Sequence, residues 1–163
     1  MTSDTSDSQD NTPNQTLALE NFLPYRLSIL SNTISGTIAS AYDKRFDLSI
    51  PEWRVMAVIA RTPGLSAAQV AERTLMDKVA VSRAVAKLLK TERITRTFAD
   101  KDKRRSILSL SARGREVYDQ VVPMALQMEA DLLLGFTDEE IGTLNVLVDR
   151  MLARMRLLGT PRV

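Results

Sequence analysis

The chain has 163 residues and a hydrophobic content of 44%, which suffices for one globular domain with its own core. It contains neither cysteine nor histidine. Disulfides, thiolate or imidazole metal sites and most general bases are therefore excluded, and we expect no metal, no cofactor and no enzymatic activity. No apolar run approaches the roughly 18 residues of a membrane span, and the first residues carry no secretory pattern, so the sequence predicts a cytoplasmic protein.

The net charge of +2 hides a strong asymmetry along the chain. Residues 73–105 contain eleven Lys and Arg against four Asp and Glu, a net charge of +7, which leaves −5 for the rest of the chain. A polyanion-binding surface requires such a concentration of positive charge. A charged stretch by itself is more often a solvated face, so the pattern of residues has to decide.

The first half of the chain predicts a tail and two helices. Residues 1–16 are polar and acidic, which is typical of a disordered tail. Residues 17–46 have apolar side chains at spacings of three and four, which predicts a long helix with Pro24 in its first turn. A second helix is expected to begin at Ser49 or Ile50 and to end before Pro63.

The middle of the chain predicts two helices followed by a hairpin. Ser66 and Gln69 match a capping box for a short helix over residues 66–73. Asp77 is expected to cap a helix over residues 78–91. Residues 94–98 and 106–110 have strand composition, and the charged residues 99–105 between them predict a turn.

Two long helices complete the expected order of elements. Ser111 is expected to cap a helix that reaches about residue 134 and is kinked at Pro123. The capping box from Thr137 to Glu140 is expected to open a last helix that ends near Leu158. The fold class is therefore mainly α with a small β-hairpin, in a single domain over residues 17–163.

The helix over residues 78–91 is predicted to read DNA. Its apolar positions recur at helical spacing and form one face, while hydroxyl and cationic groups lie largely on the other. Val79 and Ala80 keep its leading end slim enough to enter a major groove and contact thymine methyls. Alone, the pattern fits an ordinary amphipathic helix, but the capped helix before it creates a helix-turn-helix over about residues 49–112.

The charged turn after this helix is predicted to be a wing on the DNA backbone. Residues 100–105 are almost wholly charged, which a simple β-turn does not require. Arg104 is expected in the narrow minor groove, oriented by Asp102. The predicted DNA-binding residues are Ser66, Gln69, Lys78, Val79, Ala80, Ser82, Arg83, Lys87, Lys101, Asp102, Lys103, Arg104 and Arg105.

These residues resemble the MarR family, bacterial regulators named for multiple antibiotic resistance. The strongest likeness is the run Asp-Lys-Asp-Lys-Arg-Arg-Ser-Ile-Leu-Ser-Leu-Ser-Ala-Arg-Gly, which ends at Gly114. Asp102 and Arg104 align with the family's wing motif, and residues 78–87 align with its recognition helix. One departure is the turn at residues 74–76, which has no glycine.

The resemblance implies a winged helix-turn-helix protein that forms an intertwined homodimer. The dimerisation helices are expected at about residues 17–46 and 112–158, and these segments carry more Leu, Met and Val than one small domain needs to bury. Such a dimer would bind double-stranded DNA at a pseudo-palindromic operator whose half-sites lie roughly 34 Å apart. We therefore expect a ligand-responsive transcriptional regulator that acts as a repressor.

The family's small-molecule cleft implies an effector site between the first, second and fifth helices. The expected lining residues suit an aromatic acid or its CoA thioester, because they combine rings, arginines and hydrogen-bonding groups. They are Tyr25, Arg26, Ser28, Ile29, Asn32, Trp53, Arg54 and Met56. The segments that contain them are similar to a subgroup that controls hydroxycinnamate and lignin-aromatic catabolism. The alternative is core packing for the two rings and surface charge for the two arginines.

Two other functions compete with a specific regulator. A non-specific architectural protein would also need the basic segment, but it would bind operator and random DNA equally. A small enzyme would rely on carboxylates such as Asp138, Glu139 and Glu140, yet these lie where a helix N-terminus favours negative charge. No glycine-rich phosphate loop or nucleophile motif is present.

Overall fold

The computed structural model describes residues 16–99 and 102–159, with side chains for 16–98 and 106–159. Residues 1–15, nearly all of the predicted tail, lie outside the described residues. The chain forms two compact units that divide between Thr37 and Ile38. We call residues 16–37 the N-terminal unit and residues 38–159 the C-terminal unit.

The N-terminal unit consists of a short 3-10 helix, η1 (Leu19–Asn21), and the first part of helix α1 (Leu23–Phe46). Pro24 lies in the first turn of α1, where its missing N–H has no helical partner to lose. The predicted helix over residues 17–46 is confirmed from Leu23 onward, whereas its expected beginning is wrong, because residues 19–21 form a separate 3-10 helix. None of the residues in this unit is buried, although its exposed side chains include five leucines and isoleucines of α1 and η1.

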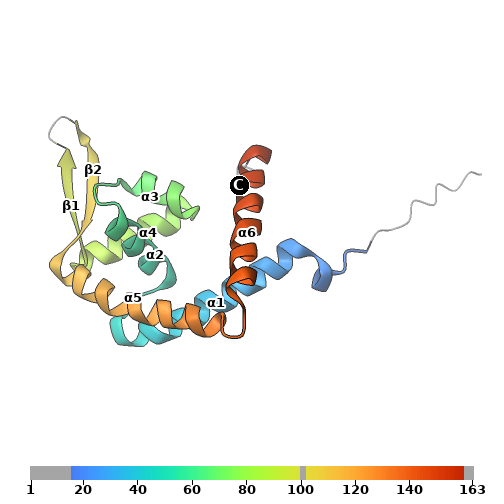
Figure 1. Ribbon diagram of the computed structural model, residues 1–163. Helices are drawn as coiled ribbons and strands as arrows, with labels where there is room; N and C mark the ends of the chain where they lie inside the picture. The colour runs from blue at the N-terminus through green and yellow to red at the C-terminus, as the bar shows by residue number, and fades with distance from the viewer. Residues whose placement is uncertain (1–15, 100–101, 160–163) are drawn as a thin grey trace, which may run out of the picture. The chain divides into compact units, whose positions relative to one another are not determined.

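Three helices build the helix-turn-helix of the C-terminal unit (Figure 1): α2 (Ile50–Arg61), α3 (Ala67–Thr74) and α4 (Lys78–Lys90). Ser49 and Ser66 open α2 and α3 with the capping boxes that the sequence contains. Asp77 accepts hydrogen bonds from the backbone N–H of Val79 and Ala80 at the start of α4. These caps satisfy helix N–H groups that otherwise have no partner, which is why the predicted starts are correct within one residue.

The hairpin pairs β1 (Ile94–Ala99) with β2 (Asp102–Leu110) in antiparallel register, with Ile94 opposite Leu110. The backbone of β2 extends back to Asp102, so the turn between the strands is shorter than the predicted residues 99–105. An isolated bridge joins Leu65 to Leu108 and attaches the hairpin to the segment before α3. The wing is thus anchored to the helices at its base.

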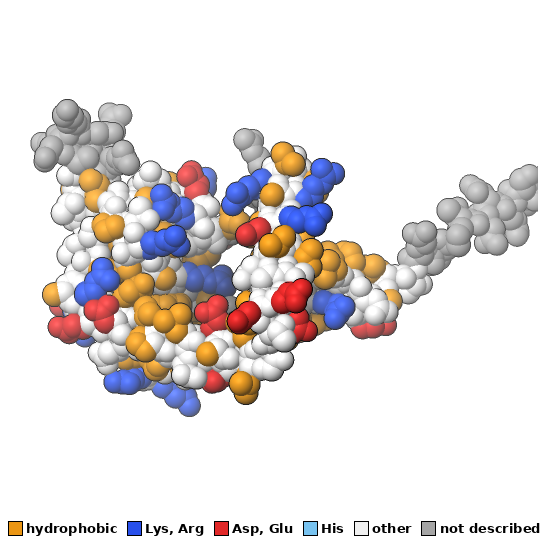
Figure 2. Space-filling view, in the orientation of Figure 1, with side chains coloured by type: hydrophobic (Ala, Val, Ile, Leu, Met, Phe, Trp, Pro, Cys, Tyr) orange, Lys and Arg blue, Asp and Glu red, His pale blue; other side chains and the backbone are white. Residues whose placement is uncertain are grey.

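Helices α5 (Ala112–Leu132) and α6 (Asp138–Leu158) end the described chain. Ser111 caps α5 through the N–H of Gly114, and Thr137 caps α6 through the N–H of Glu140. Acidic side chains gather at the start of α6 and arginines toward its end, which complements the helix dipole (Figure 2). Within the described residues, no helix is long and apolar enough to cross a membrane.

One hydrophobic core holds the C-terminal unit together. It includes the four predicted inward positions of α4, namely Val81, Ala84, Val85 and Leu88. The other buried apolar residues come from the end of α1, from α2, α3, both strands and α5. They are Tyr42, Leu48, Val55, Met56, Ile59, Leu65, Val70, Ala71, Ile94, Leu108, Val117 and Val121. The mainly α winged helix-turn-helix fold expected from the sequence is confirmed.

Gly114 occupies the tightest junction of this core. An added Cβ at this position would lie 1.8 Å from the carbonyl oxygen of Arg93. That carbonyl also accepts a hydrogen bond from the N–H of Ser111. The start of α5 therefore approaches the segment between α4 and β1 as closely as only glycine permits.

Candidate nucleic-acid interface

The leading half of α4 presents a polar face to solvent. Lys78, Ser82 and Arg83 are exposed, while the opposite face of the same helix is buried in the core. Val79 is also exposed, and Ala80 is half-buried. The structure thus brings these five predicted residues onto the accessible part of one rigid helix, which is the arrangement that reading a groove requires.

The turn between α3 and α4, which has no glycine, contains a leucine with a left-handed backbone conformation. Leu75 has a φ of 52° and is 78% exposed. A left-handed backbone is unfavourable for a residue with a Cβ and favours glycine. The turn nevertheless has normal helix-turn-helix length, because Asp77 caps α4 immediately after it.

Ser66 and Gln69 form hydrogen bonds with each other at the start of α3. The Gln69 N–H donates to Ser66 Oγ at 3.3 Å, and the Ser66 N–H donates to Gln69 Oε1 at 3.0 Å. Both side chains are half-buried. Their polar groups therefore stabilise the supporting helix, and a contact of either residue with DNA stays a prediction.

Lys87 differs from the other predicted cations of α4. Its ammonium lies 3.2 Å from Asp47 Oδ1 and 3.5 Å from Glu52 Oε2. The hydrogen bond with Asp47, together with the charge of Glu52, raises the pKa of Lys87 against the opposing effect of burial. The lysine expected to face DNA is thus held by two carboxylates of its own chain.

The described part of the wing adds two residues that sequence reasoning did not select. Arg96 and Phe98 on β1 are both exposed, and Phe98 is opposite Ser106 in the register. Lys101 lies outside the described residues. The side chains of Asp102, Lys103, Arg104 and Arg105 also lie outside them, so their DNA contacts stay predictions.

Arg93 lies within the basic segment but does not contribute to its surface charge. It is buried, and its guanidinium donates to the backbone carbonyls of Phe46 and Asp47, the latter at 3.2 Å. Its Nε has no hydrogen-bond partner. A single sequence gives no signal for this role, because a buried arginine and a DNA-binding arginine look alike in composition.

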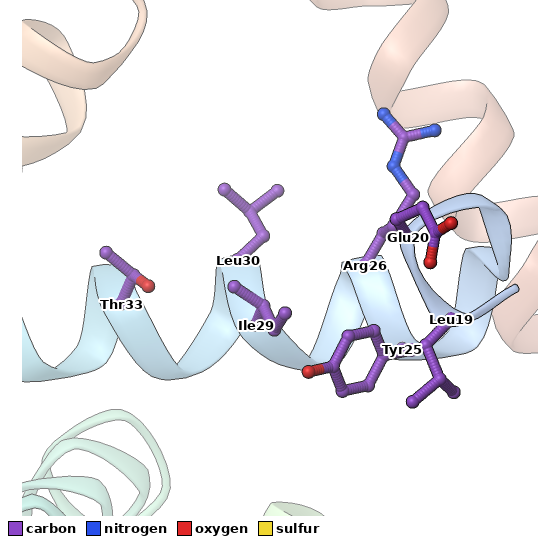
Figure 3. Close-up of a pocket in the computed structure, with 7 residues that line it drawn as sticks. All are labelled: Leu19, Glu20, Tyr25, Arg26, Ile29, Leu30 and Thr33. Carbon is purple, nitrogen blue, oxygen red and sulfur yellow. The ribbon is translucent and has the colours of Figure 1, made fainter.

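The N-terminal unit contains an open surface cavity of about 560 Å³, whose lining residues are all exposed and include three of the predicted effector residues, Tyr25, Arg26 and Ile29. Leu19, Glu20, Leu30 and Thr33 complete the lining. In Figure 3 the Arg26 guanidinium and the Glu20 carboxylate extend to the same side of the helix, and the Tyr25 ring lies beside Leu19. Ser28 and Asn32 are exposed on the same helix but do not line this cavity.

The other predicted effector residues belong to the C-terminal unit. Trp53 is half-buried between two rings, with centroids 5.9 Å from Tyr42 and 5.5 Å from Tyr118. Met56 is fully buried in the core, so its side chain has no surface to offer a ligand in this structure. Arg54 is exposed on α2 and lies close enough to Tyr42 to lower its pKa, although desolvation dominates and raises that pKa to about 12.

No metal centre is evident in the described residues. No group of three or more Asp and Glu side chains is placed to hold an ion there. The carboxylates Asp138, Glu139 and Glu140 instead occupy the first turn of α6, and Glu140 completes its capping box. The cluster is explained by helix capping.

Comparison with known proteins agrees with this geometry. A model of the MarR family matches residues 46–105. The transcriptional regulator HosA of Escherichia coli O111:H- is 26% identical over 106 residues, which cover 65% of this chain and 78% of HosA. The MarR/EmrR family transcriptional regulator of Acinetobacter sp. ADP1 is 25% identical, with a TM-score of 0.78 over 85% of this chain and 97% of that one.

A second similar structure is that of BpsR of Bordetella bronchiseptica, described by its mechanism for regulation of DNA binding by 6-hydroxynicotinic acid. It has a TM-score of 0.74 at 16% identity and covers 84% of this chain and 97% of BpsR. At that identity the likeness shows a common fold. The chain is therefore similar to the MarR family over residues 46–105, and its fold is similar to that of transcriptional regulators of this family over most of its length.

Proposed function

We propose that this protein is a sequence-specific DNA-binding regulator whose α4 reads the major groove. The observation that carries the proposal is the two-sided character of α4. Val81, Val85 and Leu88 fix one side in the core, while Lys78 and Arg83 remain exposed on the other. Arg and Lys on such a helix bind either guanine or the neighbouring phosphates, and a packed helix holds them in one register.

The hairpin supports this proposal as a wing beside the reading helix. Its base is fixed by the Leu65–Leu108 bridge, and β1 carries the exposed Arg96. We expect Arg104 to enter the minor groove and Asp102 to orient it. Replacing Arg104 with Ala should weaken DNA binding at least tenfold and leave dimerisation intact, since a good contact is worth about 1–3 kcal/mol. An unchanged affinity would remove the wing from the DNA interface.

We further propose that the protein acts as a homodimer on a pseudo-palindromic operator. The described residues of α6 are almost all exposed, including Leu144, Leu147, Leu152 and Met155. Such a large apolar surface is unfavourable in water and is typical of an interface. Two reading helices of a dimer would then reach half-sites about one helical turn apart.

The effector proposed for this regulator is a small aromatic acid or its CoA thioester, which would release the protein as a repressor from its operator. The cavity of the N-terminal unit supports it, because Tyr25 offers a ring and Arg26 a cation beside apolar walls. The regulation of BpsR by an aromatic acid supplies a parallel. Arg26→Met should reduce the effector response at least tenfold without changing operator affinity, whereas an unchanged response would place the effector elsewhere.

Measuring the affinities of operator and random duplexes at one salt concentration tests the proposed function. Fluorescence anisotropy with the DNA upstream of the protein's own gene should give binding at least about a thousandfold tighter than with a random duplex of equal length. Equal affinities would instead indicate a non-specific architectural protein. Absence of salt-dependent binding to either duplex would contradict DNA binding altogether.

A further inference from the structure

The end of the recognition helix is attached to the loop between α1 and α2. Lys87 in the last turn of α4 contacts Asp47 and Glu52, and Arg93 just beyond α4 donates to the carbonyls of Phe46 and Asp47. Two cations from one end of the reading helix thus hold a loop of only a few residues. We call the contacts of Lys87 and Arg93 with residues 46–52 the clasp.

Glu52 explains why Lys87 belongs in this clasp. Its side chain is only 7% exposed, and its Oε2 accepts a hydrogen bond from the Ser49 N–H at 3.1 Å. A buried carboxylate is costly unless a cation and hydrogen bonds compensate for its lost hydration. Moving Lys87 to a DNA phosphate would leave Glu52 buried without its cation.

Arg93 extends the clasp to the start of α5. Its guanidinium donates to the carbonyl of Phe46, the last residue of α1, and to that of Asp47 just beyond it, where helix carbonyls lack partners and the dipole favours a cation. Its own carbonyl accepts from the Ser111 N–H and lies against Gly114. Arg93, which lies between α4 and β1, therefore joins the end of α1 to the start of α5.

We propose that Lys87 is a positioning residue that sets the orientation of α4 through Asp47 and Glu52, and that it does not contact a DNA phosphate. The proposal rests on the proposed function, because it concerns how the reading helix is held. It reassigns one cation of the basic segment from DNA contact to internal support. Arg83, one turn earlier and exposed, remains a DNA-contacting residue.

Asp47 gives a test in which the two roles predict opposite signs. Its side chain is 82% exposed, so Asp47→Asn should fold normally, and asparagine tolerates the left-handed φ of 45° at this position. If Lys87 binds phosphate, removing this negative charge frees the lysine and strengthens DNA binding. If the clasp positions α4, the same change weakens specific binding.

The experiment measures operator affinity against salt concentration for the wild type, Asp47→Asn, Lys87→Met, Lys87→Arg, and two controls on the same helix. We expect Asp47→Asn and Lys87→Met each to weaken operator binding about threefold to tenfold, and their combination to weaken it no further. Neither should change the slope of log affinity against log salt. Lys87→Arg should restore binding to within about twofold of the wild type.

The controls calibrate the salt slope. Arg83→Met should lower its magnitude by about 0.9, as expected for one lost phosphate contact. Lys90→Met, at an exposed cation of the last turn, should leave the affinity within about twofold. Tighter or unchanged binding by Asp47→Asn, or a slope reduced by about 0.9 in Lys87→Met, would overturn the proposal. If the wild type itself showed no specific binding, the proposed function would be contradicted. Failure of the Lys87 proposal is thus seen in the variants, and failure of the proposed function is seen in the wild type.

Discussion

Two regions of the molecule use similar side chains to opposite effect: the core of the C-terminal unit on the one hand, and the exposed helices of the N-terminal unit together with α6 on the other. Around α2, α3 and α4, apolar residues converge from seven elements and are buried. In the N-terminal unit and along α6, leucines and isoleucines are just as frequent, yet the structure buries none of them there. The winged helix therefore shares one core with the end of α1 and with α5, whereas the N-terminal unit and α6 carry apolar surface that a single chain leaves in water. We interpret the first region as the part that folds within one chain and the second as the surface that the proposed dimer would bury.

The largest expected effect on stability is at Gly114, the closest backbone contact in the core of the C-terminal unit. Gly114→Ala should lower the free energy of unfolding by about 3 kcal/mol or more, because its methyl group would meet the backbone carbonyl of Arg93. Urea unfolding followed by circular dichroism measures this. The control is Gly142→Ala on α6, where an added Cβ has no atom within 4 Å. Equal stabilities for the two variants would contradict the described junction.

A substitution on the exposed apolar surface of α6 should have the opposite effect: it should weaken dimerisation and leave the fold intact. Leu147→Asp places a charge in the exposed apolar surface of α6 and should weaken dimerisation about hundredfold, or about 2.7 kcal/mol. Analytical ultracentrifugation gives the dissociation constant, and Asn145→Asp adds the same charge to a neighbouring polar position as a control. If Leu147→Asp remains as dimeric as the control, α6 is not the interface.

A smaller effect is expected from alkali, and it should be confined to the core. Burial raises the pKa of Tyr42 from 10.0 to about 12, so the folded chain keeps this proton after the unfolded chain has lost it. Stability is therefore fully present below pH 10 and falls as the pH rises toward 12.

Tyr42→Phe removes this titration and keeps the ring beside Trp53. Between pH 9 and 11 the wild type should lose about 1.4 kcal/mol more unfolding free energy than the variant. Lys87, whose pKa is also raised, acts in the same direction in both proteins and cancels from the difference. Parallel pH profiles would show that the Tyr42 hydroxyl is not shielded from water.

The smallest effect concerns the turn that supports the reading helix. Leu75→Gly should stabilise the protein by about 0.5 kcal/mol, since relief of the left-handed strain exceeds the entropy that glycine adds to the unfolded chain. Leu75→Ala keeps the strain and loses only an exposed side chain, so its stability should equal that of the wild type. A glycine variant less stable than the alanine variant would contradict this explanation.

The sequence predicted the elements that local chemistry determines. Four helix starts could be predicted from their capping residues, because each side chain accepts a hydrogen bond from an N–H group two or three residues ahead. These residues are Ser66, Asp77, Ser111 and Thr137. The inward face of α4 also followed from spacing alone. The strand β2 begins earlier than expected, because Asp102 pairs with Ala99 beyond an irregularity in the register after Phe98, and composition alone indicates a turn there.

The sequence could not predict which cations of the basic segment reach solvent. Lys87 and Arg93 have partners about forty residues earlier in the chain, and no local pattern encodes such contacts. The left-handed conformation of Leu75 could not be predicted either, since leucine usually avoids this conformation. For the effector residues, Tyr25 and Arg26 share a cavity, but Met56 follows the core periodicity of α2 and is buried.

Hydroxyl-radical footprinting of the full-length protein on its own upstream DNA tests the central claim most directly. A homodimer with one α4 helix in each half-site should protect two symmetric patches of DNA, with centres about one helical turn or roughly 34 Å apart. Leu147→Asp should lose both patches together, while Asn145→Asp keeps them. A single short patch, or uniform protection that ignores sequence, would contradict the account.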